Sequence, residues 1–407
     1  MFETSPIVGL EIGTSKVVAA VGQLNQAGAL NIIGVGQAVS RGVRKGEIFN
    51  CGVAEEDIRI AIDEAEKMAD VEITSVYLGV SGAHIRSLNN RGVHQVVSTD
   101  RSITPEDMDD VLKNAKAINL PPDQALVHDM RQHFVVDGQG QITDPVGMLG
   151  KMLCLDVHAV YGDYNRLNYP INIVKKLQLE VDLVAFNGLA ASLAMLTNEQ
   201  KDIGALVLDI GAGTCDFAVY CHGKIKHTGV IALGGDHITN DLVSALKVPS
   251  GLAEDLKLQH GSAILDERDK GQTVSIPSSN GTPDKTVNLE HLRKVMSLRV
   301  EEMLTLVYRA LDKEGMLDYV QAGVVICGGC ARIPNIQKLA RSIFNHLPVT
   351  VDQPSCLTGL HSSINQPEFS TALGLVKFGS LHHRKKTGGF LPKILGRGIS
   401  NLWRKQA

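Results

Sequence analysis

Two stretches of the chain share one pattern of hydrophobic and polar positions, VGLEIGTSKVVAAVG at residues 8–22 and LVLDIGAGTCDFAVY at residues 206–220. Each begins with an apolar run that contains one acid, Glu11 or Asp209, and continues through a glycine-rich turn into a second β-prone run. Apolar runs on either side of such a turn are typical of β-hairpins. We therefore predict one hairpin in each half of the chain and two related halves.

The two turns have the composition of phosphate-binding loops. Glycine leaves no Cβ between an anion and the backbone N–H groups, and Ser and Thr hydroxyls add donors. An acid just before such a turn is placed to hold Mg²⁺ through water, which makes Glu11 and Asp209 the candidate metal residues. A strand follows each turn, which excludes a Walker A loop and a dinucleotide fingerprint. Each turn alone is equally compatible with a plain hairpin. The candidate phosphate-binding residues are Gly13, Thr14, Ser15, Lys16, Gly211, Gly213 and Thr214.

Two glycine pairs precede helical patterns further along the chain. Gly234 and Gly235 come just before the pattern at 236–246, and a buried strand runs through Gly328 and Gly329 toward a helix with Pro334 near its first turn. A helix N-terminus behind a glycine pair is suited to bind a ribose or phosphate group, although ordinary strand-to-helix turns look the same. The candidate nucleoside-binding residues are Gly234, Gly235, Gly328, Gly329 and Arg332.

Residues 82–165 differ in pattern from both halves and predict a mixed α/β unit. The stretches 91–100, 124–137 and 151–161 alternate enough to be strands. Between them, residues 102–118 predict a helix that has Thr104 as its N-cap, Pro105 at its first position and Asp107 closing a capping box.

Three histidines in this unit, His128, His133 and His158, have no spacing typical of metal ligands, so we interpret them as core or surface histidines. No set of nucleophile, base and acid is visible there. The unit is therefore interpreted as an interaction module.

Two more segments have clear patterns. Residues 184–196 read as an apolar helix, and residues 291–311 read as a helix that carries the cations Arg293, Lys294 and Arg299. The stretch before the second helix is rich in Ser, Thr, Pro and Gly, which predicts loops around a short strand. The three cations are placed either to meet an acidic peptide or to form an ordinary solvated helix face.

Charge is distributed very unevenly along the chain. Residues 369–407 contain eight Lys or Arg and no Asp or Glu, which leaves the first 368 residues with 44 acidic and 32 basic side chains. The last residues also contain the only tryptophan. Drawn on a helix, the apolar residues fall on one arc and the cations cluster opposite, as in a helix that lies in a membrane surface. A packed terminal helix and a helix that binds a protein partner are the alternatives. The candidate membrane-binding residues are Leu391, Ile394, Leu395, Ile399, Leu402, Trp403, Lys393, Arg397 and Arg404.

The rest of the composition indicates a globular cytoplasmic body. With 44% hydrophobic residues, the 407-residue chain has enough apolar side chains for two domains or one large bilobal unit. The N-terminus lacks the basic and apolar regions of a secretory signal, and no stretch is long and apolar enough to span a membrane. Seven cysteines suit reduced thiols, and Cys327 and Cys330 are interpreted as buried small residues rather than a metal or redox pair.

Together, the four glycine elements resemble the phosphate and adenosine motifs of the superfamily that contains actin, sugar kinases and heat-shock chaperones. Within it, the chain resembles the FtsA family of bacterial cell-division proteins over nearly its full length. The tail and the segment SRGVRKGEI at residues 40–48 are the most specific matches. The other matching stretches, in the family's order, are VGLEIGTSKVVAAVG, NIIGVGQAVSRGVRKGEIFN, VYLGVSGAHI, DPVGMLG, LVLDIGAGTCDFAVY, VICGGCARIPNI and STALGLVKFG.

The resemblance implies an α/β, actin-like (ribonuclease H-like) bilobal fold with an FtsA-type, SHS2-like inserted subdomain and a C-terminal amphipathic helix. The implied units are 1–81, 166–204 and 370–379 for the first lobe, 82–165 for the insert, 205–235 and 305–369 for the second lobe, 236–304 for a small subdomain, 380–389 for a linker and 390–405 for the amphipathic helix.

The resemblance also implies a function. The family binds Mg²⁺-ATP between the lobes, polymerises, and tethers the FtsZ ring to the cytoplasmic face of the plasma membrane at the division septum. It implies that the tail of FtsZ binds the small subdomain, that anionic lipid binds the terminal helix, and that later divisome membrane proteins are recruited. No nucleic-acid partner is expected.

The chain departs from the superfamily pattern at several positions. Glu11 stands where Asp is usual, and Ala212 and Asn335 replace frequent glycines. Asn187 and Gly188 stand where chaperone relatives carry Glu-Pro, so no carboxylate is evident to polarise an attacking water. We therefore expect ATP binding with weak or regulatory hydrolysis, and leave the catalytic residues unassigned. A sugar or carboxylate kinase of the same superfamily and a pilus-type scaffold are the alternative functions.

Overall fold

Two β-sheets of the same topology form the centre of the molecule. The computed structural model describes residues 5–25, 28–276, 285–351, 354, 359 and 365–386. Within these residues the sheet orders are β3-β2-β1-β6-β11 and β14-β13-β12-β17-β18, and in each sheet the first three strands are antiparallel and the remaining pairs parallel. The predicted pair of related halves is thus confirmed.

Both predicted hairpins are present. Glu11 pairs with Val18 in the first, and Asp209 pairs with Asp216 in the second, so each acid lies at the same level of its hairpin. The first sheet contains β1 (Ile7–Ile12), β2 (Lys16–Leu24), β3 (Leu30–Val39), β6 (Ser75–Val80) and β11 (Glu180–Phe186). The second contains β12 (Ala205–Ile210), β13 (Cys215–Cys221), β14 (Lys224–Ile231), β17 (Gly323–Cys327) and β18 (Val349–Val351).

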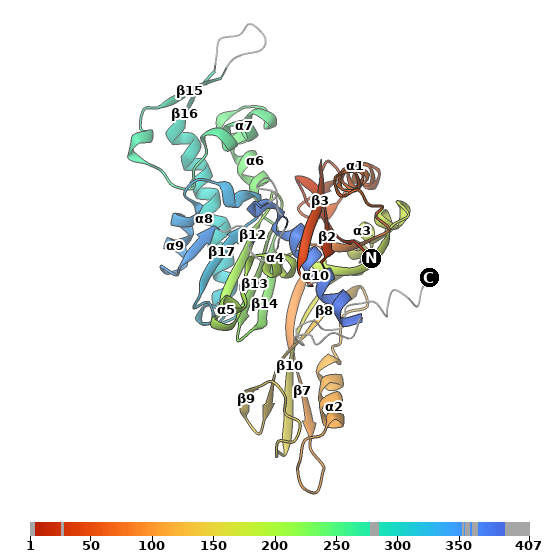
Figure 1. Ribbon diagram of the computed structural model, residues 1–407. Helices are drawn as coiled ribbons and strands as arrows, with labels where there is room; N and C mark the ends of the chain where they lie inside the picture. The colour runs from red at the N-terminus through yellow and green to blue at the C-terminus, as the bar shows by residue number, and fades with distance from the viewer. Residues whose placement is uncertain are drawn as a thin grey trace.

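Helices cover both sheets, and two of them lie between the sheets (Figure 1). On the first sheet α1 packs against β2 and β3, whereas α10 packs against β1, β2 and β6 on the opposite face. The neighbour of α10 is α4, which also contacts β12 and β13 of the second sheet. The helices of the two halves are α1 (Cys51–Ala69), α3 (Tyr164–Lys176), α4 (Asn187–Met195), α5 (Asn198–Ile203) and α10 (Ser370–Lys386), and α6 (Gly235–Leu246), α7 (Ser250–His260), α8 (Leu289–Lys313) and α9 (Ile336–Ile343).

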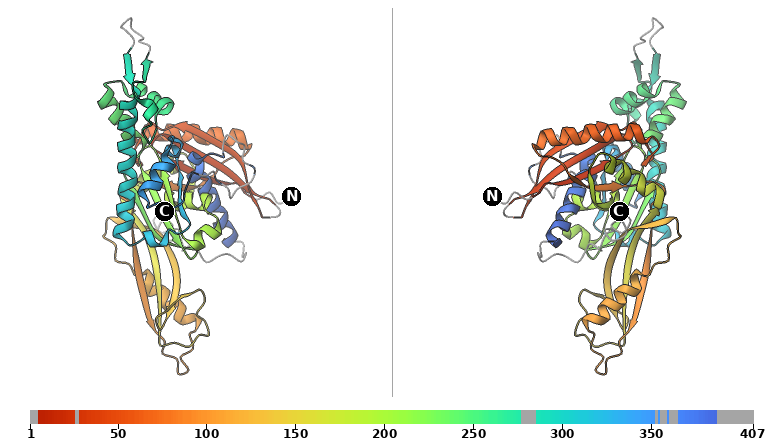
Figure 2. Two further views of the ribbon diagram at one scale, coloured as in Figure 1. Left: turned by 90° about the vertical axis from the view of Figure 1, so that its left-hand side faces the viewer. Right: turned by 90° about the vertical axis from the view of Figure 1, so that its right-hand side faces the viewer.

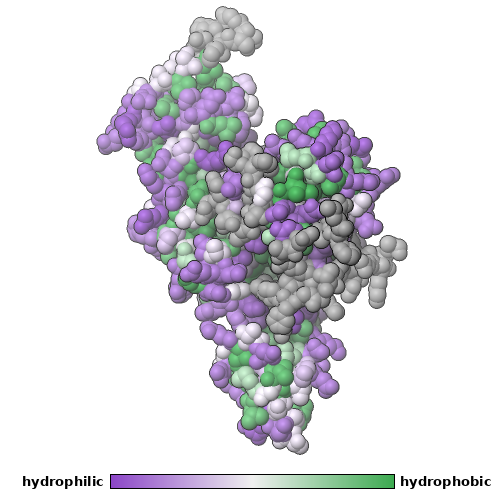
Figure 3. Space-filling view, in the orientation of Figure 1, coloured by the Kyte–Doolittle hydropathy of each residue, from purple (hydrophilic) through white to green (hydrophobic). Residues whose placement is uncertain are grey.

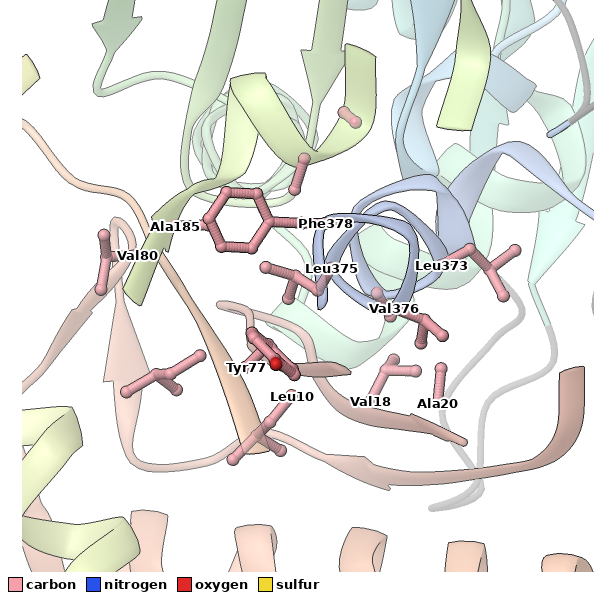
Figure 4. Close-up of a cluster of buried hydrophobic side chains, with 14 of the residues drawn as sticks. Leu10, Val18, Ala20, Tyr77, Val80, Ala185, Leu373, Leu375, Val376 and Phe378 are labelled. Atoms are coloured by element: carbon pink, nitrogen blue, oxygen red, sulfur yellow. The ribbon is translucent and has the colours of Figure 1, made fainter. Parts of the chain in front are cut away.

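Helix α10 is the centre of the first lobe's core. In Figure 4, Val376 of this helix points toward Val18, and Leu375 and Phe378 lie in the same buried cluster as Leu10 and Tyr77 of the sheet. All six side chains are buried. Gly374 lies on the α4 side, where an added Cβ would stand 1.9 Å from the carbonyl oxygen of Ala190. The two helices therefore approach each other more closely than any larger residue would allow.

A third sheet forms the insert, which projects from the lobes at the end opposite β15 and β16 (Figures 1 and 2). Its strand order is β7-β10-β8-β9, and α2 begins with the predicted capping box between Thr104 and Asp107. The predicted strands 124–137 and 151–161 are present, whereas the strand expected at 91–100 runs instead from Arg86 to Gln95. The elements are β7 (Arg86–Gln95), α2 (Pro105–Lys116), β8 (Gln124–Val136), β9 (Gln139–Ile142) and β10 (Met152–Asp163).

The insert packs on β14, the edge strand of the second sheet. The hydroxyl of Ser87 donates to the carbonyl of Thr228 over 2.7 Å, and Gln132 donates to the carbonyl of Ile225. His158 is fully buried, with Nε2 3.0 Å from the Thr228 hydroxyl. Burial lowers the pKa of His158 to about 3 and that of His128 to about 4, which keeps both rings neutral. Of the two interpretations that the sequence left open, core or surface, these two histidines belong to the core.

Smaller elements complete the described chain. The hairpin β4 (Val43–Arg44) and β5 (Glu47–Ile48) precedes α1, and β15 (Thr273–Ile276) pairs with β16 (Lys285–Asn288) in the segment predicted as loops around a short strand. Short 3₁₀ turns are η1 (Glu267–Asp269), η2 (Leu317–Tyr319), η3 (Gly329–Arg332) and η4 (Pro367–Phe369).

The C-terminal part departs from the expected pattern at one point. Helix α10 continues through Lys386, into the stretch 380–389 that was expected to be a linker. The candidate membrane-binding residues between 391 and 404 lie outside the described residues.

The described surface is largely hydrophilic on the face shown in Figure 3, with hydrophobic residues on the insert at the bottom and in smaller patches on both lobes. Val97 and Leu149 of the insert are 87% and 71% exposed, respectively. No helix among the described residues has the length and hydropathy that crossing a membrane requires.

Replacing Gly374 with Ala should lower the melting temperature by about 3 to 10 °C, because the new Cβ overlaps the Ala190 carbonyl and overpacking costs about 1–3 kcal/mol. The melting temperature is measured by thermal unfolding. Gly251→Ala in α7 is the matched control, since no atom lies within 4 Å of its Cβ position, and it should leave the melting temperature unchanged or raise it. Equal melting temperatures for wild type and Gly374→Ala would contradict the packing described.

Candidate functional site

The two glycine turns meet between the lobes. Each turn is closed by a backbone hydrogen bond, from Gly13 to the Lys16 carbonyl over 3.0 Å and from Gly211 to the Thr214 carbonyl over 2.9 Å. A Cβ at Gly213 would lie 2.3 Å from Oγ1 of Thr14, so the two turns are in contact. The structure therefore brings together the candidate phosphate-binding residues of both halves.

Three carboxyl groups lie beneath these turns. Burial is the main cause that raises the pKa of Glu11 to about 8, and the charge of Asp209 adds to it. Burial and the charge of Asp209 also raise the pKa of Asp216 to about 7, although hydrogen bonds from Ser81 and Thr214 oppose this shift. The pKa of Asp209 is raised by burial as well. The three acids thus repel one another in a poorly solvated space.

A cation fits this group of acids. Oε2 of Glu11 is buried and has no hydrogen-bond partner among the described residues. A divalent cation near Glu11 and Asp209 would stabilise the charged form of both acids, which burial disfavours. Within the described residues, no three His, Cys, Asp or Glu side chains are placed to hold a metal directly.

Asp216 and Thr371 are site residues that the sequence analysis missed. Oγ of Ser81 donates to Asp216 over 2.5 Å, and Thr371 at the start of α10 donates to Asp209 over 2.5 Å. Asp216 had a sequence signal, because it follows Thr214 by two positions on a strand and so shares its face. Thr371 had none, because it lies 162 residues from its partner.

Lys16 is directed toward the acids and α10. Its ammonium lies 4.0 Å from the ring centroid of Phe369, and its pKa is lowered by burial and raised by the charge of Glu11. Its charge also lowers the pKa of both Glu11 and Asp209, against their burial. Lys16 therefore balances part of the negative charge in the site.

The glycine pair at the start of α6, Gly234 and Gly235, has a structural role. The backbone N–H groups of Gly235 and Asp236 donate to the carbonyls of Gly211 and Ala212 over 3.0 and 2.8 Å. These two N–H groups at the N-terminus of α6 hold the glycine turn of the second lobe, residues 211–214, in place. A candidate nucleoside site at this pair must therefore use other atoms.

The second glycine pair leads into a 3₁₀ turn rather than directly into a helix. The turn η3 follows Gly328, and α9 begins only at Ile336 after Asn335, which has a φ of 65°. No atom lies within 4 Å of a Cβ built on Gly329, so its surface is open. Arg332 forms an ion pair with Glu368 over 2.7 Å.

A polar cluster on α6 and α7 lies next to Gly235. Lys257, whose side chain is 10% exposed, donates to Oγ1 of Thr239 over 2.9 Å and forms an ion pair with Glu254 over 2.6 Å. Its ammonium is also 3.3 Å from the carbonyl oxygen of Gly235. The spacing of Glu254 and Lys257 on a helix was the sequence signal for this cluster, which the sequence analysis did not use.

Asn187 begins α4 at the position where a carboxylate would be expected in chaperone relatives. Its Oδ1 is buried and has no hydrogen-bond partner among the described residues. An amide at this point cannot act as a general base.

Comparisons with known proteins point to one family. The family model described as cell division protein FtsA matches residues 206–374, and the model of the SHS2 domain inserted in FtsA matches residues 82–161. The cell division protein FtsA of Pseudomonas aeruginosa is 37% identical over 395 residues, covering 97% of this chain and 93% of the relative. Those of Neisseria meningitidis and Escherichia coli are 38% and 36% identical, covering 94% and 93% of this chain and 91% of each relative.

Solved structures share the fold at low sequence identity. The PilM-PilN type IV pilus biogenesis complex superposes with a TM-score of 0.64 at 15% identity, covering 92% of this chain and 98% of that chain. MreB5 of Spiroplasma citri, in a structure bound to ADP, superposes with a TM-score of 0.56 at 16% identity, covering 95% of this chain and all of that chain. The actin-like fold expected from the sequence is thus confirmed.

The raised pKa of Glu11 predicts a pH-dependent stability in EDTA. Glu11 has a higher pKa in the folded protein than in the unfolded chain. Its contribution to the free energy of unfolding is therefore fully present below its pKa in the unfolded chain, and it is lost as the pH rises through about 8. Glu11→Gln has no carboxyl group to titrate and does not show this loss. The melting temperature of Glu11→Gln minus that of wild type should therefore increase by about 3 to 6 °C between pH 5 and pH 8. Glu301→Gln, at an exposed position of α8, is the control. A constant difference between wild type and Glu11→Gln would contradict the assignment.

Proposed function

Because the chain belongs to the FtsA family of cell division proteins, we propose that it binds Mg²⁺-ATP between its lobes, polymerises, and tethers the FtsZ ring to the membrane. Identities of 36–38% over more than nine-tenths of both chains make it an actin-like cell division protein. The observation that carries the ATP site is the contact of Thr14 with Gly213 above Glu11, whose Oε2 is buried, and the buried Asp209.

The two turns are proposed to hold the phosphates. Their glycines expose backbone N–H groups, and Thr14 and Ser15 add hydroxyl donors, whereas the hydroxyl of Thr214 already donates to Asp216 over 3.0 Å. Glu11 and Asp209 would hold Mg²⁺ through water, and the ion would neutralise phosphate charge when bound. Gly329 and the cluster around Lys257 would lie on the nucleoside side. Solved structures of MreB5, which share the fold, are described as bound to ADP and to AMPPNP.

Hydrolysis is proposed to be slow. The chain has Asn187 where a carboxylate would polarise an attacking water, and an amide has no proton-accepting charge. Asp216 is close to the two glycine turns and accepts one hydrogen bond on each of its oxygens, from Ser81 and Thr214. Nucleotide would then regulate assembly rather than drive rapid turnover.

The small subdomain at 236–304 is proposed to bind the tail of FtsZ. Of the three cations on α8, Arg293 already pairs with Asp269 and Arg299 with Asp241, both over 2.5 Å. Lys294 is exposed and forms no ion pair among the described residues. An acidic peptide would therefore meet Lys294 first, and would compete with internal partners for the two arginines.

The insert is proposed to contact later divisome proteins or a second copy of the chain. Val97 and Leu149 are 87% and 71% exposed, and Val93 and Met152 are also exposed nearby on the same sheet. Exposed apolar side chains that gather in one region mark interaction surfaces. The insert projects away from the lobes, which makes this region accessible to partners (Figure 2).

The C-terminal residues are proposed to bind the cytoplasmic face of the membrane at the septum. Burial of apolar side chains in lipid and attraction of the cations to anionic lipid favour binding of this segment, whereas the conformational entropy lost on ordering it opposes binding. A single tail would then bind weakly and reversibly, whereas a filament would hold many tails on one surface and gain avidity.

Asp209→Ala should weaken Mg²⁺-ATP binding by about 10- to 100-fold, because it removes one of the two acids proposed to face the metal. Isothermal titration with and without EDTA measures the effect, which should be much smaller without Mg²⁺. Asp110→Ala, on the exposed side of α2, is the control. Unchanged affinity for Mg²⁺-ATP in Asp209→Ala would remove the metal assignment.

Co-sedimentation with anionic liposomes tests the tether. The full chain should pellet with lipid, and more so with ATP, whereas a chain that ends at Gly389 should stay in solution. Neutral liposomes are the control, and they should retain less of the full chain because the cations lose their partners. Equal behaviour of the two chains would favour the kinase or scaffold alternatives.

A further inference from the structure

A short hairpin from the first lobe carries a lysine in an unfavourable backbone conformation. Strands β4 and β5 are joined by the two residues Lys45 and Gly46, which have φ angles of 52° and 75°. Positive φ angles at both residues are typical of a type I′ turn, in which Asn and Gly are preferred. A residue with a Cβ destabilises such a turn by roughly 1 kcal/mol. Lys45 is one of several non-glycine residues with a positive φ, and the contacts of this hairpin distinguish it from the others.

The tip of this hairpin lies across both phosphate turns. The N–H group of Gly46 donates to Oγ1 of Thr14 over 2.9 Å. On the other side, a Cβ at Gly213 would lie 2.8 Å from Cα of Lys45, and a Cβ at Gly46 would lie 3.0 Å from Cγ2 of Thr214. The backbone of Lys45 is therefore in contact with the second lobe although it belongs to the first.

Three contacts fix the hairpin in place. Glu47 accepts two hydrogen bonds from Arg166 of α3, at 2.7 and 2.9 Å. The guanidinium of Arg44 lies 4.9 Å from the ring centroid of Phe49. Arg41, just before the hairpin, is bound by the buried carboxylate of Asp57 in α1. The tip is thus held on the cleft by the first lobe.

The ammonium of Lys45 is not used within the described protein. The residue is exposed and forms no ion pair among the described residues, in contrast to Lys16, which is directed into the buried acids. Burial lowers the pKa of His237 at the start of α6, and the charge of Lys45 lowers it further, so the two groups lie within electrostatic reach. Lys45 therefore presents its charge to the cleft side of the second lobe.

We propose that Lys45 binds the terminal phosphate of a nucleoside triphosphate at the two glycine turns, and thereby makes the site distinguish ATP from ADP. This inference rests on the proposed ATP site. The backbone of Lys45 contacts the glycine turn of the second lobe, and its ammonium forms no ion pair among the described residues. The hairpin belongs to the first lobe, and its tip contacts the glycine turns of both lobes. The terminal phosphate carries the charge that ADP lacks, so the ammonium contributes mainly to ATP affinity.

The test compares two substitutions at this position. Lys45→Asn removes the ammonium but suits the backbone conformation, so the fold should be kept or slightly stabilised. Lys45→Arg retains the charge. Dissociation constants for Mg²⁺-ATP and Mg²⁺-ADP are measured by titration, together with the melting temperature. Lys247→Asn is the matched control, because Lys247 has a φ of 53° at the far end of α6.

Lys45→Asn should weaken ATP binding by about 10- to 100-fold and leave ADP binding within about twofold, while Lys45→Arg and Lys247→Asn keep the wild-type ratio. An equal loss for both nucleotides, or no loss for either, would overturn the role of Lys45 while leaving the ATP site intact. Failure of the wild-type chain to bind either nucleotide would overturn the proposed ATP site and this inference with it.

Discussion

The close packing of α10 against α4 between the two sheets is the contact on which the arrangement of the site depends. Gly374 allows the two helices to approach, and the apolar side chains of α10 fix it on the first sheet. Its first turn is thereby held next to the second lobe, where Thr371 binds Asp209. One helix thus contributes to the core of one lobe and to the polar centre between the lobes.

That polar centre links the lobes through charge. Glu11 comes from the first lobe and Asp209 and Asp216 from the second, and all three have raised pKa values in a space that solvent reaches poorly. Repulsion between them opposes close approach of the lobes, whereas the hydrogen bonds of Ser81 and Thr371 favour it. A bound cation would change this balance, so occupancy of the cleft and the relative position of the lobes are physically coupled.

Local features of the fold were predictable from the sequence, and long-range polar contacts were not. Both hairpins and the capped helix α2 followed from apolar periodicity and from residues such as Thr104, because these signals act over a few positions. The pairing of Ser81 with Asp216 and the ion pairs of Arg293 and Arg299 join residues that are 24 to 135 positions apart. Such partners depend on how the sheets pack, which no local pattern records. The extension of α10 through Lys386 was missed because the boundary at 380 came from the family resemblance, which does not fix where a helix ends in this chain.

The cover that the insert provides over β14 has a consequence for the order of folding. An edge strand presents unpaired backbone groups, and such an edge in a half-folded chain can pair with another chain. The strands of the insert, from Arg86 to Asp163, precede β14 at Lys224–Ile231 in the chain and are therefore synthesised first. In the folded protein Ser87 and Gln132 donate to backbone carbonyls of Thr228 and Ile225 on this edge. The insert thereby covers backbone groups that an open edge would present to another chain.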